Sequence, residues 1–359
     1  MDLSIHSTQE AQIVGLKLIK WFQIHQRKLP WRDNATIYGR LVSEFMLQQT
    51  QVATVVPYYL RWMNIFPTIE LLAHTTEAQV LKLWEGLGYY TRARNLHTVA
   101  QILTDRSKNF SSIQYPQTPE EWETLPGIGL YIAKALAAIA QNFPVATVDG
   151  NVIRVLCRIN AIKFNFLSKD QAVKLITPIA QIYVPAKQSS AYNEAIMELG
   201  ALICKPKNPN CDSCPIGAHC KTNALKIDPQ TIPCFKKIIY IKRYIRRACY
   251  VKDQKLLLKL TSTKRLNKIY ELPTFEDLKI NNDSAMELIS TIRRSITNER
   301  ITEEIYKVQN LNQIPSNIAL IPLKELHSIT LSGPHRKWIQ NWYPHGESNP
   351  GFQNENLTS

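Results

Sequence analysis

Four cysteines near the middle of the chain constrain its fold more than any other feature. They follow the pattern C-x6-C-x2-C-x5-C, at Cys204, Cys211, Cys214 and Cys220. Only one pair has the C-x2-C spacing that zinc modules use twice, so the pattern favours a cubane iron-sulfur cluster. A structural zinc site stays open as the alternative. With either metal, ligation would tie the segment 204–220 into a fixed loop.

The net charge of the chain indicates a polyanionic partner. The sequence has 43 Lys and Arg against 29 Asp and Glu, a formal charge of +14, and an excess of this size favours nucleic acid. No apolar run is long enough to cross a bilayer or to act as a signal-peptide core. We therefore expect a cytoplasmic, nucleoid-associated protein without membrane contact. In that reducing compartment clustered cysteines bind metal rather than form disulfides.

Apolar periodicity predicts a mostly α protein with a smaller α+β part. Within 1–225, apolar residues recur every three to four positions, which predicts an all-α domain. A basic connector follows at 226–244. Short apolar runs within 245–341 predict strands, with a helix near Met286–Arg294. The polar residues 342–359 are rich in Gly, Asn and Pro and predict a tail without a fold of its own.

Two carboxylates stand where their acidities should differ. Glu44 lies in the apolar stretch Leu41–Leu47, where burial raises the pKa of a carboxyl group and lets it keep a proton near neutrality. Asp149 precedes a helical pattern, and the N–H groups and dipole of a helix start keep a carboxylate ionised. One acid and one anion suit cleavage of a glycosidic bond through an oxocarbenium-like state. A solvated Glu44 and a merely capping Asp149 are the alternatives.

A glycine-rich turn offers a phosphate site. Gly127 and Gly129 come directly before the helical pattern 130–141, and free N–H groups at a helix start bind phosphate. Amide and aromatic side chains in two loop-like segments could fill the space of a nucleotide that leaves a duplex. They are Gln48, Gln49 and Tyr89. An ordinary helix-turn-helix turn and partly buried packing residues are the alternative interpretations.

Taken together, six motifs resemble the MutY family of adenine DNA glycosylases. They are Leu29–Arg32, Ser43–Val52, Gly86–Leu96, Leu125–Gly129, Val148–Val152 and the four cysteines. The resemblance is strong from about Gln26 to Cys220 and loose beyond. It implies a helix-hairpin-helix enzyme with a 4Fe-4S cluster that removes adenine mispaired with 8-oxoguanine or guanine in double-stranded DNA. We expect a monomer.

The resemblance also assigns modules and residue roles. It implies a six-helix barrel module at about 30–137 and a cluster module formed by 1–29 and 138–225. Glu44 would protonate adenine, Asp149 would stabilise the sugar cation, and Asn151 would position Asp149. The remaining implied contacts are with DNA: Arg32 in the adenine pocket, Gln49 and Tyr89 beside the lesion, and Gly127 and Gly129 on backbone phosphate.

Tyr131 separates this chain from bifunctional relatives. It occupies the hairpin position where enzymes of the endonuclease III type have a catalytic lysine, so Schiff-base strand cleavage should be absent or weak. Lys134 is the only near substitute. A bifunctional glycosylase and lyase nevertheless stays open as an alternative, as does a non-catalytic iron-sulfur DNA-binding protein. The latter would leave Glu44 and Asp149 without a role.

The second domain resembles the MutT-like, or Nudix-like, lesion-reading module of the family. Its segment Arg265–Pro273 stands where a Gly-Leu-Trp-Glu-Phe-Pro pattern is common. Ile296, Thr297 and Asn298 replace the usual Phe-Ser-His triplet. Thr297 keeps a hydroxyl group for DNA contact, but the aromatic and imidazole groups are missing. We therefore expect discrimination of 8-oxoguanine from guanine to be weaker or differently built.

Overall fold

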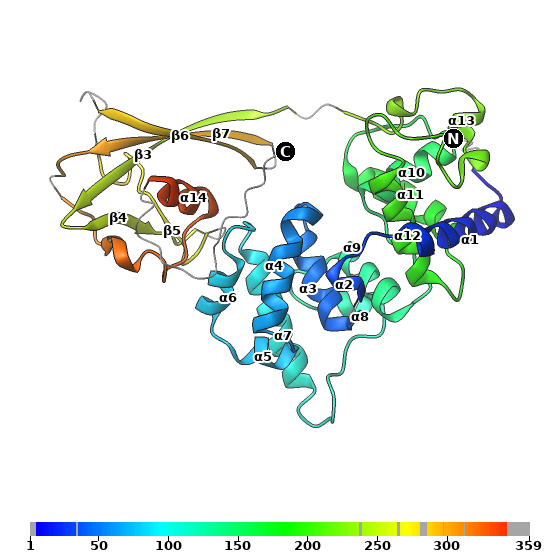
Figure 1. Cartoon of the computed structure of the whole chain (residues 1–359), viewed down its shortest axis with the longest axis horizontal. Helices are drawn as coiled ribbons and strands as arrows, with labels where there is room; N and C mark the ends of the chain where they lie inside the picture. Colours follow the sequence, from blue (N-terminus) through cyan, green and yellow to red (C-terminus); the bar gives the residue numbers. More distant parts are fainter. Residues whose placement is uncertain are drawn as a thin grey trace. The chain divides into compact units, whose positions relative to one another are not determined.

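The computed structural model of the chain consists of two compact units, each described by itself below. Unit 1 comprises residues 1–73 and 98–237, and unit 2 comprises 74–97 and 238–359. Figure 1 shows the ribbon of the chain. The structure describes residues 5–33, 35–236, 239–263, 266–280, 286–296, 298–311 and 313–342.

Unit 1 is almost entirely helical, as its apolar periodicity predicted. Its first helices are α1 (Thr8–His25), α2 (Pro30–Asp33), α3 (Ile37–Leu47), α4 (Val52–Ile65) and α5 (Ile69–His74). Its later helices are α8 (Pro119–Glu123), α9 (Leu130–Ala135), α10 (Gly150–Ile159), α11 (Lys169–Tyr183), α12 (Ser189–Leu202) and α13 (Lys221–Ala224). Hydroxyl groups cap several of the helix starts: the side chain of Ser7 accepts a hydrogen bond from the backbone N–H of Glu10, and that of Thr36 from Gly39.

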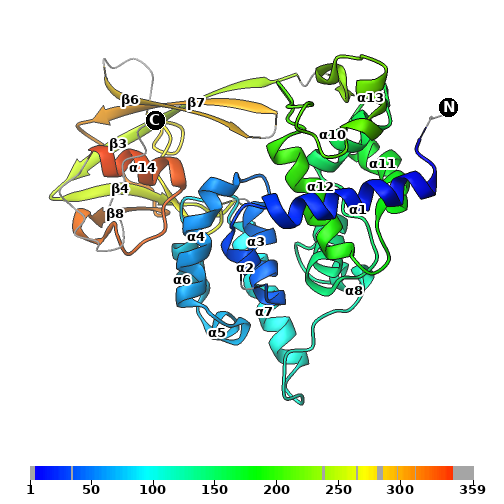
Figure 2. The same ribbon diagram turned by 45° about the vertical axis from the view of Figure 1, so that its right-hand side comes forward.

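One hydrophobic core joins four long helices of unit 1. Buried side chains of α1, α10, α11 and α12 pack together, among them Leu18, Leu156, Ile176 and Ile196, and the helices lie side by side in Figures 1 and 2. Gly15 permits this packing, because a Cβ atom there would lie 2.5 Å from the carbonyl oxygen of Tyr183. The core fixes α10, which carries the candidate catalytic residues, against α12.

Unit 2 contains a mixed sheet of six strands. The strands are β3 (Ile241–Lys252), β4 (Lys255–Leu260), β5 (Tyr270–Glu271), β6 (Glu287–Ile296), β7 (Glu299–Val308) and β8 (Ile318–Pro322). Their order is β5-β4-β3-β7-β6, and β8 pairs with β4. β3 and β7 are parallel, whereas β6 and β7 form an antiparallel hairpin.

Helix α14 (Gly333–Trp342) covers one face of this sheet (Figure 1). Its Trp338 and Ile339 pack into a core with Leu256 of β4 and Ile305 of β7. Helix α6 (Glu77–Trp84) and the first part of α7 (Thr91–Arg106) also belong to unit 2. They are held by the hydroxyl group of Tyr90, which donates to the carbonyl of Leu331, and by an ion pair between Glu85 and Arg336.

One predicted element is wrong. The segment Met286–Arg294 was expected to be a helix, but Glu287–Ile296 forms strand β6. Its residues alternate in exposure, and its β-branched side chains pair with β7 in register. Of the predicted tail 342–359, Trp342 belongs to helix α14, and residues 343–359 lie outside the described residues, as does Thr297. Among the helices that the structure describes, none is long and apolar enough to span a bilayer.

Candidate active site

Helix α3 carries Glu44 within unit 1. Its neighbours Leu41, Val42, Phe45 and Met46 are fully buried, so α3 is embedded in the core around this residue. Glu44 itself keeps some accessible surface. The pKa of Glu44 is raised to about 7, mainly by desolvation and in part by the charge of nearby Asp149. The side chain can therefore hold a proton near neutral pH and still be reached by a substrate.

Asp149 caps the first turn of α10. One carboxylate oxygen accepts a hydrogen bond from the backbone N–H of Val152 at 2.8 Å, and the other accepts one from Nδ2 of Asn151 at 2.8 Å. Two N–H donors and the positive end of the helix thus converge on this carboxylate. The predicted capping position of Asp149 is thus confirmed. Each oxygen retains a lone pair for interaction with a positive charge.

Tyr131 lies in the same electrostatic neighbourhood. Desolvation by burial raises the pKa of its hydroxyl well above the ordinary value, and the charges of Glu44 and Asp149 act in the same direction. Couplings of this kind operate over short distances. Electrostatic interaction therefore links Glu44 of α3, Tyr131 of α9 and Asp149 at the start of α10. Tyr131 stays neutral there and supplies an O–H group rather than an amine.

Asn151 is itself held by Arg154. The guanidinium donates from Nη2 to Oδ1 of Asn151 at 2.8 Å and to the carbonyl of Gly200 at 2.7 Å, and from Nε to the carbonyl of Cys204 at 2.7 Å. A Cβ atom on Gly200 would lie 2.6 Å from Cβ of Asn151, so α12 approaches α10 closely at this point. Hydrogen bonds thus connect Asp149 to the first of the four cysteines.

A second group of charges, which the sequence did not reveal, borders Glu44. Arg40 donates to Glu194 at 2.8 Å, and of this pair Arg40 lowers and Glu194 raises the pKa of Glu44. Arg32 joins the group, since its Nε donates to Glu194 at 2.9 Å and its Nη2 to Glu198 at 3.2 Å. The role of Arg32 in an adenine pocket stays a prediction. Glu194 and Glu198 are four residues apart in a largely apolar helix and therefore lie on one helix face. This spacing is the sequence signal from which the charged group could have been predicted.

The glycine turn before α9 has the predicted geometry. Gly127 has a φ of 77°, a left-handed conformation that favours glycine, and Gly129 occupies the N-cap without a side-chain hydrogen bond. A Cβ atom on Gly129 would meet nothing within 4 Å, so the space beside the helix start is open. Binding of phosphate there stays a prediction.

The predicted duplex-entering residues lie at turns. Gln49, which follows α3 and Gln48, has a φ of 57°. Tyr89, which precedes α7 in unit 2, has a φ of 50° and is 36% exposed. The guanidinium of Arg92 lies 5.5 Å from the ring centroid of Tyr89. Left-handed backbone at residues other than glycine is uncommon, and such outliers gather at functional sites.

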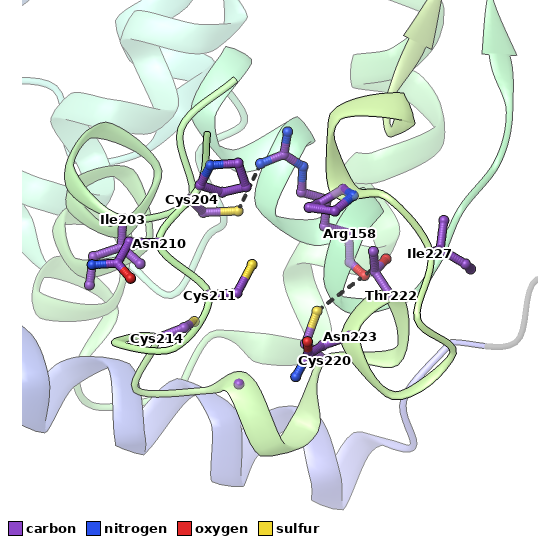
Figure 3. Close-up of a pocket in the computed structure, with 13 residues that line it drawn as sticks. Arg158, Ile203, Cys204, Asn210, Cys211, Cys214, Cys220, Thr222, Asn223 and Ile227 are labelled. Carbon is purple, nitrogen blue, oxygen red and sulfur yellow. Dashed lines mark hydrogen bonds between the residues drawn. The ribbon is translucent and has the colours of Figure 1, made fainter. Parts of the chain in front are cut away.

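The four cysteines line one cavity of unit 1 (Figure 3). Nη1 of Arg158 lies 3.4 Å from Sγ of Cys204, and the same guanidinium donates to the carbonyls of Lys205 and Pro206. Burial, helped by the charges of the other three thiols, raises the pKa of Cys214 to about 11. Among the described residues, no three His, Cys, Asp or Glu side chains converge closely enough to hold a single metal ion.

Comparison with known proteins agrees with this arrangement. Residues 42–181, which include Glu44, Tyr131 and Asp149, match the sequence model of the HhH-GPD superfamily of base excision DNA repair proteins. The chain is 37% identical over 264 residues to the adenine DNA glycosylase of Schizosaccharomyces pombe, covering 65% of this chain and 56% of that protein. It is 40% identical over 213 residues to the human adenine DNA glycosylase, covering 57% of this chain and 38% of that protein.

The resemblance to adenine DNA glycosylases is thereby confirmed, although the chain spans only about half the length of the curated relatives that it matches.

Solved structures support the fold of the helical part. A thermostable thymine-DNA glycosylase aligns with a TM-score of 0.51 at 22% identity, covering 60% of this chain and 98% of that one. A non-covalent endonuclease III–DNA complex gives 0.50 at 21% identity, covering 62% and 99%. The helical part therefore has the endonuclease III-like fold.

Proposed function

We propose that the chain is a monofunctional adenine DNA glycosylase, which hydrolyses the N-glycosidic bond of adenine mispaired with 8-oxoguanine or guanine in duplex DNA. The unequal pair of carboxyls carries the proposal. Glu44 has a pKa of about 7, whereas Asp149 accepts two N–H hydrogen bonds as an anion should. One group can donate a proton while the other stays negative, and glycosidic cleavage requires this division of roles.

The reaction follows from these two side chains. Glu44 gives its proton to a ring nitrogen of the flipped adenine, and the pair of electrons in the glycosidic bond moves to the base as the bond breaks. The carboxylate of Asp149, fixed by Asn151 and Val152, stabilises the positive charge on the sugar. Water then bonds to the sugar carbon, and its proton passes to the Glu44 carboxylate. The products are free adenine and an abasic site.

Tyr131 supports a monofunctional enzyme. A Schiff base needs a neutral amine near the sugar carbon, whereas the group that shares the neighbourhood of Glu44 and Asp149 is a protonated hydroxyl. Lys134 lies about one helical turn beyond Tyr131. We therefore propose that the abasic strand is left intact.

We infer that the four cysteines hold a 4Fe-4S cluster. Their common cavity and the guanidinium of Arg158 beside Cys204 support this assignment, since a positive donor stabilises thiolate ligands. When bound, the cluster would cross-link the loop 204–220 and supply no group to base release. Iron and sulfide content together with visible charge-transfer absorption tests the assignment, and a colourless protein with one zinc per chain would contradict it.

We also propose that unit 2 is the MutT-like module that reads the base opposite adenine. The mixed sheet covered by α14 supports a separately folded module. The absence of aromatic and imidazole groups at Ile296 and Asn298 predicts modest preference for 8-oxoguanine over guanine. Rates of adenine release from the two duplexes measure this preference directly.

One assay tests the whole proposal. The protein is incubated with duplexes that contain adenine opposite 8-oxoguanine, guanine or thymine, and each sample is divided and treated with or without alkali. We expect strand breaks in the first two duplexes only after alkali, which cleaves abasic sites. Breaks without alkali would favour a lyase. Release of no adenine from any duplex, by protein that binds them, would contradict the proposed activity.

A further inference from the structure

The long strands of unit 2 place polar and cationic side chains in rows. β3, β7 and β6 lie side by side (Figures 1 and 2), and side chains two residues apart on a strand share one face. The register therefore defines two adjacent rows on the same face of the sheet. They are Lys242, Arg300 and Ser295 in the first row, and Tyr244, Thr302 and Arg293 in the second.

These six residues, named here the ribbon face, line a hollow of about 370 Å³ together with Arg294 and Ile301 of the same strands. Lys242, Arg293 and Arg300 are exposed, and Tyr244 is 71% exposed. The face belongs to the part of β3 that lies outside the core, because burial along that strand begins only at Arg247. The hollow is thus open to solvent and to a large ligand.

The positive charges of the ribbon face are not neutralised by neighbouring carboxylates. Among the described residues, none of the three cations Lys242, Arg293 and Arg300 has an ion-pair partner, and the guanidinium of Arg300 lies 4.4 Å from the ring centroid of Tyr240. The nearest carboxylate along β7, Glu299, belongs to the opposite face and pairs with Arg243 at 3.9 Å. The next carboxylate of β7 on the same face as the three cations is that of Glu304, which lies one row beyond Thr302.

On the opposite face of the same strands, by contrast, cations do have carboxylate partners. There, Arg247 and Arg294 both form ion pairs with the buried carboxylate of Glu303. Arg247 and Arg294 on the inner face are therefore matched by an acid, whereas Lys242, Arg293 and Arg300 on the outer face have no ion-pair partner among the described residues. Unpaired cations that gather in a hollow together with hydroxyl groups are suited to an anionic ligand that also accepts hydrogen bonds.

We propose that the ribbon face binds the phosphodiester backbone of nucleic acid. The cations lie on neighbouring strands about 4.8 Å apart and on rows about 7 Å apart, so they can meet successive phosphates of one strand. Ser295, Thr302 and Tyr244 supply neutral donors to phosphate and sugar oxygens. The choice of nucleic acid rests on the proposed function, while the surface itself is an independent observation.

The proposal predicts a change in salt dependence. Each phosphate contact contributes about −0.9 to the slope of log K against log salt concentration for duplex DNA. The double substitution Lys242→Gln and Arg293→Gln should therefore reduce the magnitude of that slope by about 1.8. If the variant and the parent protein bind DNA equally at 1 M salt, the variant should bind about 30-fold more weakly than the parent at 0.15 M salt.

A matched control lies on the same sheet. Lys252 and Lys255 face each other at the far end of β3 and β4, are exposed, and lie about ten residues, or about 33 Å, along β3 from Lys242. The double substitution Lys252→Gln and Lys255→Gln removes the same charge from unit 2. The full-length variants are compared with the parent protein on a duplex without a mispair, after circular dichroism and thermal melting have shown that both are folded.

We expect the ribbon-face variant to lose slope and affinity and the control variant to keep both. Equal slopes for the ribbon-face variant and the parent protein would overturn the proposal, as would an equal loss in the control variant. Weakened binding to anionic lipid vesicles with unchanged binding to DNA would also overturn it. If the parent protein released no adenine and the ribbon-face slope still fell, the proposed catalytic function alone would fail.

Discussion

Replacing Glu44 with glutamine should make the protein more stable at high pH while it removes the proposed catalytic acid. The native pKa of Glu44 is about 7, against an ordinary value of 4.5. The folded state therefore keeps a proton between these two pH values that the unfolded chain has released. By linkage, the wild-type free energy of unfolding falls as pH rises from about 4.5 to 7 and is then constant with respect to this group.

The magnitude follows from the difference in pKa. At about 1.4 kcal/mol for each pH unit, the ionised carboxylate of Glu44 costs the folded state about 3 kcal/mol above pH 7. Glutamine has the shape of the protonated acid and no charge to desolvate. The variant Glu44→Gln should thus exceed the wild type in stability by up to about 3 kcal/mol at pH 8, and by little at pH 4.5.

Urea unfolding at several pH values, followed by tryptophan fluorescence, measures this difference. Glu123→Gln serves as the matched control, because Glu123 is an exposed acid of unit 1. The difference in free energy of unfolding between Glu123→Gln and wild type should not grow with pH as that of Glu44→Gln does. If Glu44→Gln and wild type differed by the same amount at pH 5 and pH 8, the desolvation of Glu44 would be refuted.

Three further predictions follow from the site. Single-turnover release of adenine should decrease as pH rises through about 7, because Glu44 must be protonated; a rate that is constant from pH 6 to 8.5 would contradict this. Gly200→Ala should push Asn151 away, because the new Cβ would lie 2.6 Å from Cβ of Asn151. We expect it to lower the free energy of unfolding by about 1–3 kcal/mol and to slow base release. The control Gly129→Ala, whose new Cβ meets no atom within 4 Å, should change stability little. Arg158→Gln should lower the cluster content, read from visible absorption and iron analysis, because the guanidinium donates to Cys204 and to the loop carbonyls beside it; unchanged content would remove Arg158 from cluster assembly.

The local features of the active site were predictable from the sequence. Asp149 caps α10 because a polar residue directly precedes an apolar helical pattern, and this signal is contained in adjacent residues. The same holds for the turn at Gly127, whose positive φ a glycine makes easy. The apolar surroundings of Glu44 likewise indicated its raised pKa correctly.

The features that join distant parts of the chain were not predictable. Arg40 and Glu194 are 154 positions apart and meet only because α12 packs beside the first helices, so no local pattern reveals the pair. The contact of Arg154 with Cys204 spans 50 positions and has the same origin. For strand β6, apolar residues at mixed spacing suggested a helix, and pairing with β7 decided the outcome.

The central claim is that Glu44 keeps its proton near neutral pH beside the side chain of Asp149, and a titration of Glu44 by carbon NMR tests it most directly. Protein labelled at the glutamate side-chain carboxyl carbon would be titrated from about pH 4 to pH 9, and the Glu44 signal would be assigned by its absence in Glu44→Gln. A midpoint near 7 is predicted, and it should shift downward in Asp149→Asn, since the charge of Asp149 contributes to the high pKa. A midpoint near 4.5 that is the same in wild type and in Asp149→Asn would contradict the account.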